Sequence, residues 1–146
     1  MKGIIFIGLQ ASGKSSFFLQ NFYEQYLRLN LDMLKTRNRE RILFQACLES
    51  KQPCVIDNTN PTKASRANYI DLFKRHRFEV SGYYFESKIA ECLQRNAQRT
   101  GKSFVPELAV KGTYNKLELP SYAEGFDKLF YVQLVESGFN IQEWET

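Results

Sequence analysis

A glycine-rich loop directly after the first hydrophobic run restricts the folds open to this 146-residue chain. Residues 3–8 read GIIFIG, and residues 8–15 read GLQASGKS, which matches the pattern G-x-x-x-x-G-K-[ST] at every position. In this pattern the glycines let the backbone turn tightly, and the loop N–H groups and the positive end of the next helix face an anion. The sequence therefore predicts a buried strand, a phosphate-binding loop and a helix in succession.

The polar residues of the loop have separate predicted roles. Lys14 is expected to bridge the outer phosphates of ATP, and Ser15 to coordinate Mg²⁺, so ATP and Mg²⁺ are the expected cofactors. The residues predicted to contact the nucleotide from this loop are Gly8, Ala11, Ser12, Gly13, Lys14, Ser15 and Ser16. The alternative is an ordinary strand–helix turn without a ligand.

Strand patterns alternate with helix patterns along the chain. Strands are predicted at residues 3–8, 27–32, 53–57, 78–86 and 126–134, and helices at 14–25, 33–50, 61–76, 87–99 and 106–116. This order predicts one α/β domain over residues 1–146, with a parallel five-stranded sheet and helices on both faces. The strand order 2-3-1-4-5 of small P-loop kinases would make it a P-loop NTPase fold. The loop, Asp32 and Asp57 would then share the carboxyl edge of the sheet.

The amino-acid composition indicates which kinds of partner the chain could bind and where in the cell it is expected. The 20 Lys and Arg exceed the 16 Asp and Glu, for a net charge of +4, which suits a polyanionic partner without requiring one. No apolar run approaches the ~18 residues of a membrane span, so no membrane contact and a cytoplasmic location are expected. The three cysteines Cys47, Cys54 and Cys92 are odd in number and widely spaced, and are expected to be small core residues.

Two carboxylates are candidates for chemistry beside the loop. Asp32 is placed where it could accept the proton of an acceptor hydroxyl as a general base, although a helix N-cap is an alternative that can coexist with this role. Asp57 follows the apolar residues 54–56, like the acidic residue after a Walker-B strand. It could orient metal-bound water or the acceptor, and a structural turn residue is the alternative.

Two basic groups complete the candidate set. Arg95 and Arg99 are spaced i, i+4 before the turn TGK at 100–102, and could form a lid that neutralises charge on the phosphates; a solvated helix face is the alternative. The second group crowds the predicted helix after Asp32 and comprises Lys35, Arg37, Arg39 and Arg41. It could bind a phosphodiester backbone, and a solvated basic helix is again the alternative.

With these residues in view, the chain resembles the kinase domain of polynucleotide kinase/phosphatase enzymes, the animal DNA-repair type more than the phage type. The resemblance extends to about Leu134 and is strongest in GLQASGKSSF, NLD at 30–32, IDNTNPTKASRANYI, RNAQRTGKSFVP and LPSYAEGF. It implies ATP-dependent phosphorylation of the 5′-hydroxyl end of DNA or RNA. No phosphatase signature is present, so removal of a 3′-phosphate is not expected from this chain.

The resemblance also implies roles for individual residues. Lys14 and Ser15 take the phosphate and metal roles, Asp32 is the general base, Asp57 acts on the metal or acceptor side, and Arg99 is the lid residue with Arg95 nearby. The implied acceptor-binding set is Asp32, Lys35, Arg37, Asp57 and Asn58. The chain departs from the family at Leu31, where the family commonly has arginine, and at Lys35, where the phage type has arginine. Both departures concern the acceptor side.

Two other functions are compatible with the same motifs. A kinase of a small hydroxylated metabolite or nucleotide would use the same scaffold with a tight pocket in place of a basic groove. A nucleotide-binding module that transfers no phosphate would need only the loop. The carboxylate at Asp32 argues against this last possibility, because a protein that only binds nucleotide has no need of a base there.

Overall fold

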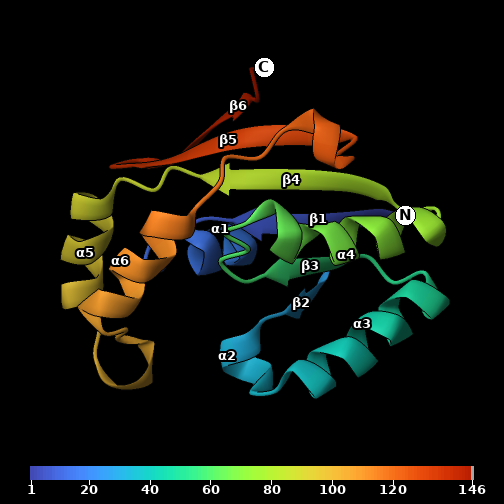
Figure 1. The fold of residues 1–146 in the computed structure, drawn as a ribbon, viewed down its shortest axis with the longest axis horizontal. Helices are drawn as coiled ribbons and strands as arrows, with labels where there is room; N and C mark the ends of the chain where they lie inside the picture. Colours follow the sequence, from blue (N-terminus) through green and yellow to red (C-terminus); the bar gives the residue numbers. More distant parts are fainter. Residues whose placement is uncertain (146) are drawn as a thin grey trace.

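The computed structural model describes residues 1–145, apart from the side chain of residue 102. Within these residues one sheet has six strands, in the spatial order β2 (Leu27–Leu29), β3 (Cys54–Asp57), β1 (Lys2–Ile7), β4 (Glu79–Phe85), β5 (Lys128–Val135) and β6 (Gly138–Glu143). The first five run parallel, and β6 pairs antiparallel with β5 (Figure 1). The α/β fold and the predicted order of the five parallel strands are confirmed.

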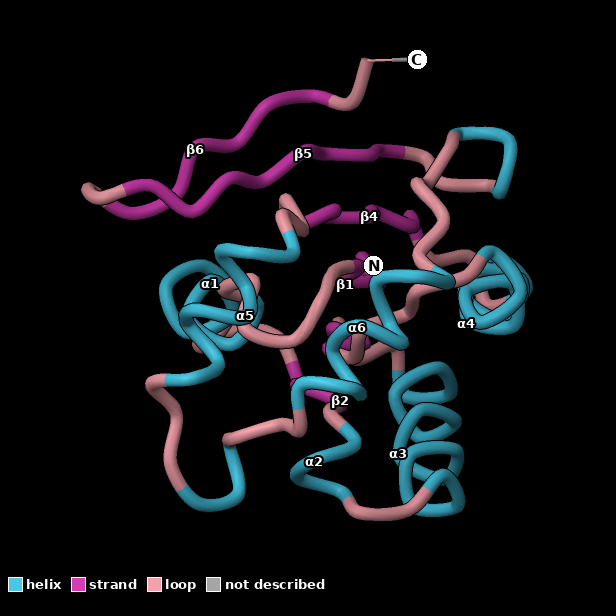
Figure 2. Tube along the Cα trace, turned by 60° about the vertical axis from the view of Figure 1, so that its left-hand side comes forward, coloured by secondary structure: helices cyan, strands magenta, loops and turns pink. Residues whose placement is uncertain are grey.

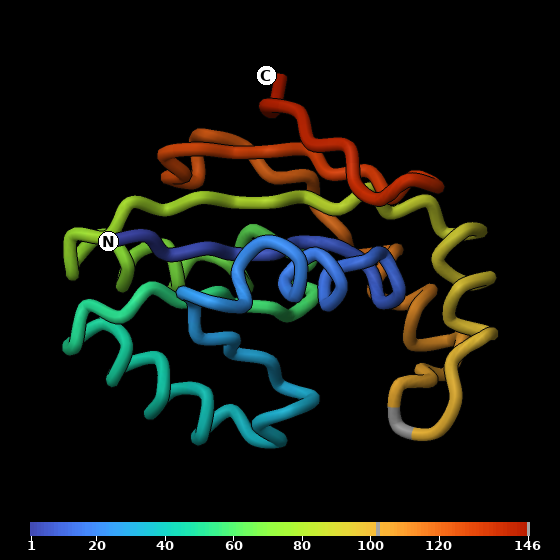
Figure 3. The backbone as a smooth tube through the Cα atoms, turned by 180° about the vertical axis from the view of Figure 1, so that it is seen from behind, coloured from blue at the N-terminus to red at the C-terminus, as the bar shows by residue number. Residues whose placement is uncertain are grey.

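The helices cover both faces of this sheet. They are α1 (Lys14–Asn21), α2 (Leu31–Leu34), α3 (Arg37–Ser50), α4 (Lys63–Arg75), α5 (Ile89–Ala97) and α6 (Glu107–Lys116), with two 3₁₀ turns, η1 (Gly101–Ser103) and η2 (Tyr122–Glu124). Helix α4 lies in front of the sheet in Figure 1, and α1 lies on the opposite face, which Figure 3 shows from behind. Helices α5 and α6 stand beyond the carboxyl ends of the parallel strands, at the edge that Figure 2 turns toward the viewer.

The core follows from the alternation of side chains along β1. Ile4 and Phe6 point to the α1 face, where Phe6 packs edge-to-face on Phe17 with ring centroids 5.9 Å apart. Ile5 and Ile7 point to the other face and join the cluster beneath α3 and α4. Because both faces are covered, β1 is buried and apolar from Gly3 to Ile7 and has no alternating polar positions there. All three cysteines are buried and unpaired by disulfide, as expected.

The sheet has one strand more than the predicted five, because the chain turns back after β5. Glu136 and Ser137 form the turn of the hairpin, and Gly138, the first residue of β6, has a φ of +134°, a conformation that glycine adopts readily. The returning strand β6 is an edge strand with mostly exposed residues, so its pattern is weak. Two aromatic side chains anchor it to the rest of the fold: Phe139, within the strand, packs on Phe17, and Trp144, directly after the strand, packs on Tyr84.

The segment around Asp32 differs from the prediction in two respects. Strand β2 ends at Leu29, so Asp32 lies in the first turn of the short helix α2 and does not end a strand. The predicted helix over 33–50 is broken at Lys35, whose φ of +77° ends α2. Thr36 then caps α3 by accepting a hydrogen bond from the backbone N–H of Arg39 at 3.1 Å.

None of the helices in the described part of the chain is long and apolar enough to cross a membrane.

Candidate active site

The glycine-rich loop joins β1 to α1 and is held from three sides. Backbone and side-chain groups of later segments contact it, so the loop is positioned by the segments after β3 and β4 and by α5. The contacts are Gly8 N–H to Thr59 O (3.0 Å), Leu9 N–H to Ser87 Oγ (3.0 Å) and Arg95 Nε to Ala11 O (2.6 Å).

The interior of the loop fits an anion. Gly13 has a φ of +104°, and a Cβ there would lie 3.0 Å from the Phe139 ring, so a larger residue would be both strained and crowded. A Cβ at Gly8 would lie 3.0 Å from Ser12 Oγ. This Ser12 hydroxyl is buried and has no hydrogen-bond partner among the described residues. An unpartnered buried hydroxyl inside a loop of N–H groups is the environment that a phosphate oxygen satisfies.

Lys14 is folded back onto its own loop. Its Nζ donates to the carbonyl oxygens of Gly8 at 3.0 Å and Leu9 at 2.7 Å. Burial lowers the pKa of Lys14 to about 8, and the nearby carboxylate of Asp57 partly opposes this shift. Lys14 therefore loses its proton at a lower pH than an exposed lysine does.

One cavity of about 290 Å³ brings half of the predicted site residues together. It lies at the carboxyl edge of the parallel strands. The predicted residues that line it are Ala11, Lys14, Ser15, Asp32, Asp57, Asn58 and Arg99, together with Gln10, Asn30, Leu31, Thr59 and Val105. The loop that would hold phosphate and the proposed base thus face the same space.

Other predicted residues lie outside this cavity. Gly8, Ser12 and Gly13 form the loop itself, and Ser16 is exposed on α1. The Arg95 guanidinium lies against the back of the loop at Ala11. Lys35 is exposed in the turn after α2 and is not among the residues that line this cavity or the one beside it.

Sequence reasoning missed Arg28 of β2. Its Nε donates to Asp57 Oδ2 at 2.7 Å, and its Nη2 donates to Ser15 Oγ at 2.9 Å. The Ser15 hydroxyl and the Asp57 carboxylate are hard oxygen donors of the kind that Mg²⁺ prefers, so the predicted metal ligands fit that ion. Nothing in the local sequence marks Arg28, because its two partners lie 13 and 29 residues away.

Two asparagines hold the turn that carries Asp32. The Asn30 side chain caps α2 by accepting from Met33 N–H at 3.1 Å, and its amide donates to the backbone oxygen of Asp57. The Asn58 side-chain oxygen accepts from Leu31 N–H at 3.0 Å. The Asp32 carboxylate is exposed, but its backbone is therefore tied to the end of β3.

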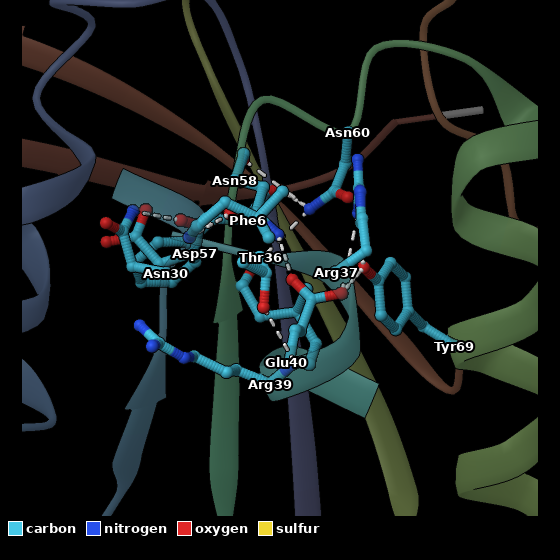
Figure 4. A network of polar contacts seen from close by, with 12 residues as sticks. Phe6, Asn30, Thr36, Arg37, Arg39, Glu40, Asp57, Asn58, Asn60 and Tyr69 are labelled. Carbon is cyan, nitrogen blue, oxygen red and sulfur yellow. Dashed lines mark hydrogen bonds and ion pairs between the residues drawn. The ribbon is translucent and has the colours of Figure 1, made fainter. Parts of the chain in front are cut away.

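A buried carboxylate on α3 orients Asn58 (Figure 4). Glu40 is 4% exposed and accepts hydrogen bonds from Asn58 Nδ2 at 2.8 Å and from the Tyr69 hydroxyl. Arg37 Nη1 lies 3.4 Å from Glu40 Oε1. Burial and the hydrogen bond to Glu40 raise the pKa of Tyr69, so the tyrosine stays a donor. With its NH₂ group directed at Glu40, Asn58 presents its oxygen to Leu31.

A second cavity of about 480 Å³ opens beside the first, between α3 and α4. The two cavities share Leu31, Asn58 and Thr59. The second has aromatic and aliphatic walls, polar amides and hydroxyls, and exposed arginines at its rim; its lining includes Phe44, Tyr69, Leu72, Gln45, Asn68, Ser65, Arg37 and Arg41. A group bound there would lie next to the Asp32 turn.

Arg99 is carried by a loop whose base is closed. Asn96 donates through Nδ2 to Val105 O at 2.6 Å and accepts from Val105 N–H at 3.0 Å. The Arg99 guanidinium donates to Ser103 O at 3.2 Å within the same loop and lines the first cavity. The segment between α5 and α6 is therefore a compact loop at the mouth of the site.

A sequence profile of the family described as AAA domain matches residues 4–120, from β1 through the site to the segment after α6. The chain belongs to the AAA domain family. Its curated relatives include the bifunctional polynucleotide phosphatase/kinase of Schizosaccharomyces pombe, 28% identical over 84% of this chain. A protein named as a candidate bifunctional polynucleotide phosphatase/kinase, from Acanthamoeba polyphaga mimivirus, is 32% identical over 86% of the chain. The matches span 31% and 32% of those longer proteins.

Two solved structures with a similar fold are a gluconokinase and Kti12. A gluconokinase from Sinorhizobium meliloti 1021 superimposes with a TM-score of 0.65 and 18% identity, covering 92% of this chain and 83% of its own. Chaetomium thermophilum Kti12 in complex with ADP-AlF3 superimposes with a TM-score of 0.70 and 15% identity, covering 92% of each chain. These likenesses establish the P-loop kinase fold. The resemblance to polynucleotide kinase/phosphatase enzymes is confirmed as distant homology by the curated relatives.

Proposed function

We propose that this AAA domain protein is an ATP-dependent kinase that phosphorylates the 5′-hydroxyl end of DNA or RNA. The observation that carries the proposal is the shared cavity, in which Asp32 faces the same space as Lys14 and Arg99. The names of the distant relatives support a polynucleotide acceptor.

The cavity supplies groups for each part of the transfer. Mg·ATP, when bound, would provide the γ-phosphoryl group and the ADP leaving group, with Ser15 and Asp57 as metal ligands. Asp32 accepts the proton of the 5′-hydroxyl as the hydroxyl oxygen bonds to the γ-phosphorus, and the bond from that phosphorus to the bridging oxygen of ADP breaks. Lys14 and Arg99 stabilise the negative charge that develops on the phosphoryl oxygens.

The second cavity suits the terminal nucleotide of the acceptor. Its aromatic wall at Tyr69 and Phe44 can contact a base, and its amides can hydrogen-bond base edges. Arg37 and Arg41 at the rim are exposed and can contact the phosphates that follow the terminal nucleotide. Because Leu31 and Asn58 line both cavities, a nucleotide held there would have its 5′ end near Asp32.

A small-molecule kinase is the second candidate, and the size of the second cavity favours it. A space of about 480 Å³ lined by amides and hydroxyls can also enclose a sugar-sized acceptor. In that case the exposed arginines at the rim would contribute nothing to the acceptor, since a free sugar has no phosphodiester.

The deciding experiment compares kcat/KM for a short 5′-hydroxyl oligonucleotide, a nucleoside and a panel of sugars with Mg·ATP. We expect the oligonucleotide to exceed both by at least about tenfold, and its affinity to fall with rising salt. Changing Arg37→Gln and Arg41→Gln together should weaken oligonucleotides of different sequence equally and reduce the salt slope by about 2. The matched control is Lys2→Gln with Arg75→Gln, two exposed charges that line neither cavity.

The other outcomes identify the rival functions. A small molecule preferred by more than about tenfold, or ~1.4 kcal/mol, would replace the polynucleotide with a metabolite as acceptor. ATP binding without transfer to any member of the panel would instead indicate a nucleotide-binding module.

A further inference from the structure

A guanidinium occupies the space between the two predicted metal ligands. Arg28 reaches from β2 to Ser15 Oγ on α1 and to Asp57 Oδ2 on β3, at 2.9 and 2.7 Å. The Phe18 ring lies 5.9 Å from the guanidinium carbon and flanks it. One fork of donors therefore satisfies both oxygen atoms from different elements at the same time.

Asp57 and Arg28 differ in their freedom to move. The Asp57 side chain is 1% exposed and its backbone oxygen is held by the Asn30 amide, so the carboxylate cannot follow a departing partner. The Arg28 side chain is 26% exposed and sits on the short strand β2 at the edge of the sheet. A buried carboxylate needs a countercharge, and in this structure the Arg28 guanidinium contacts it directly.

A divalent cation cannot join this arrangement without displacing the arginine. It would require the same Ser15 and Asp57 oxygen atoms, and it would lie against a positive guanidinium, so both the space and the charge are unfavourable. The phosphates of a nucleotide change this balance, because they add negative charge and further oxygen ligands beside Ser15.

We propose that Arg28 is a positioning residue that holds the metal position of the nucleotide-free protein, so that a divalent cation enters only together with a nucleotide. Arg28 leaves Ser15 as the cation takes its place, while Asp57 exchanges one countercharge for another. The inference rests on the proposed assignment of Ser15 and Asp57 as metal ligands. It requires neither turnover nor a particular acceptor.

The test measures Mn²⁺ binding by electron paramagnetic resonance in the absence of nucleotide. The unmodified protein should bind Mn²⁺ weakly, and Arg28→Met should raise the affinity at least tenfold. The double variant Arg28→Met with Asp57→Asn should lose that gain. Arg75→Met, which removes an exposed arginine that lines neither cavity, is the matched control and should leave Mn²⁺ affinity unchanged.

Addition of ADP separates this inference from the proposed function. With ADP present, the unmodified protein should bind Mn²⁺ strongly, and the gap to Arg28→Met should narrow. If ADP does not promote Mn²⁺ binding to the unmodified protein or to the variant, the metal assignment within the proposed function is wrong. A protein that binds Mn²⁺ with ADP but phosphorylates no polynucleotide would contradict the acceptor and leave the role of Arg28 intact.

Two results would overturn the role of Arg28 itself. One is equal Mn²⁺ affinity of the unmodified protein and Arg28→Met without nucleotide; the other is a gain that persists when Asp57 is also changed. If Arg28→Met does not fold, Arg28→Lys replaces it, because lysine keeps the charge but not the rigid fork that spans both oxygen atoms. Without nucleotide, Arg28→Lys should then bind Mn²⁺ more tightly than the unmodified protein does, but less tightly than the unmodified protein with ADP. A Mn²⁺ affinity equal to that of the unmodified protein would contradict the inference.

Discussion

Lys14 and Arg28 both have partners within the chain before any ligand arrives. Lys14 donates to loop carbonyls, and Arg28 donates to Ser15 and Asp57. A ligand that binds here must therefore replace protein contacts with stronger ones. The intramolecular contacts of Lys14 and Arg28 therefore contribute to the affinity for a ligand, beside the contacts that the ligand makes.

The lowered pKa of Lys14 predicts a pH-dependent nucleotide affinity. The pKa of Lys14 is about 8. Bound phosphate favours the charged form of the lysine, so this pKa should rise when the nucleotide binds. ATP affinity should be insensitive to this group below pH 8 and fall about tenfold per pH unit above it, with proton uptake on binding. Calorimetric titrations from pH 7 to 9.5 in two buffers of different ionisation enthalpy measure both quantities.

Lys14→Met provides the control for this profile. The variant should bind ATP more weakly and lose the alkaline decline and the proton uptake. A flat profile for the unmodified protein up to pH 9.5 would contradict the prediction.

Asp32→Asn should separate chemistry from nucleotide binding. The amide has the same size but cannot take a proton, so ATP affinity should stay within about twofold while the transfer rate falls ~10²–10⁴-fold. Single-turnover kinetics with labelled ATP measures the rate, and Asp71→Asn on the exposed face of α4 is the control. Lost ATP affinity with a normal single-turnover rate would make Asp32 structural.

At the scale of elements, the sequence predicted correctly those segments whose structure is determined by interactions between adjacent residues. The loop between Gly8 and Ser15 and the buried strand β3 carry their signals in adjacent residues, and both were predicted correctly. The break between α2 and α3 is marked in the sequence only by Thr36, which caps α3. This signal is weak, because the residues on both sides of Thr36 also fit one continuous helical pattern. For strand β6 the only signal was the turn at Glu136–Ser137 with the glycine after it, because the residues of this edge strand form no buried run.

The contacts of the site were less predictable than its location. The carboxyl edge followed from topology, whereas Arg28, Glu40 and Tyr69 act through partners distant in sequence. Such pairs leave no periodic pattern, since each is formed only when strands and helices pack. The individual roles of the site residues stay predictions.

Helix α3 should control the rate through Glu40. In Glu40→Leu no oxygen remains to accept from Asn58 Nδ2, so the Asn58 side chain would lose the contact that directs its oxygen toward Leu31. We expect kcat to fall roughly tenfold or more, with ATP affinity unchanged because the loop is untouched. Steady-state kinetics and ATP titrations measure the two.

Tyr69→Phe is the matched variant, because it removes a donor to Glu40 but leaves Asn58 in place. It should lower the free energy of unfolding by about 1 kcal/mol while kcat stays near normal. Equal losses of kcat in both variants would indicate a general packing effect.

At the scale of the whole molecule, one buried arginine joins distant segments. Arg66 of α4 is fully buried, forms a two-point ion pair with Glu124 of η2 at 2.8 and 3.1 Å, and donates to Asn60 O at 2.9 Å. The Asn60 side chain in turn donates to Phe6 O of β1. This chain of contacts explains why the segments around TNPTKASRANY and PSYAEGF, far apart in sequence, belong together.

Arg66→Met should therefore destabilise the whole fold. It leaves the buried Glu124 carboxylate unpaired, so the free energy of unfolding should fall by ~3–5 kcal/mol. Urea unfolding followed by the fluorescence of Trp144, the single tryptophan, measures the change. Adding Glu124→Leu should recover most of the loss, and a double variant as unstable as the single one would show that the ion pair is not the cause.

The two hydrogen bonds between Asn96 and Val105 have a consequence for how the site can close. They pin the ends of the loop that carries Arg99, so most of its conformational entropy is already lost when the protein folds. Movement of Arg99 toward a nucleotide can then occur as a hinge motion of a preformed unit, without ordering a free segment. Release of product would correspondingly require only the reverse swing, with no local unfolding step to slow it.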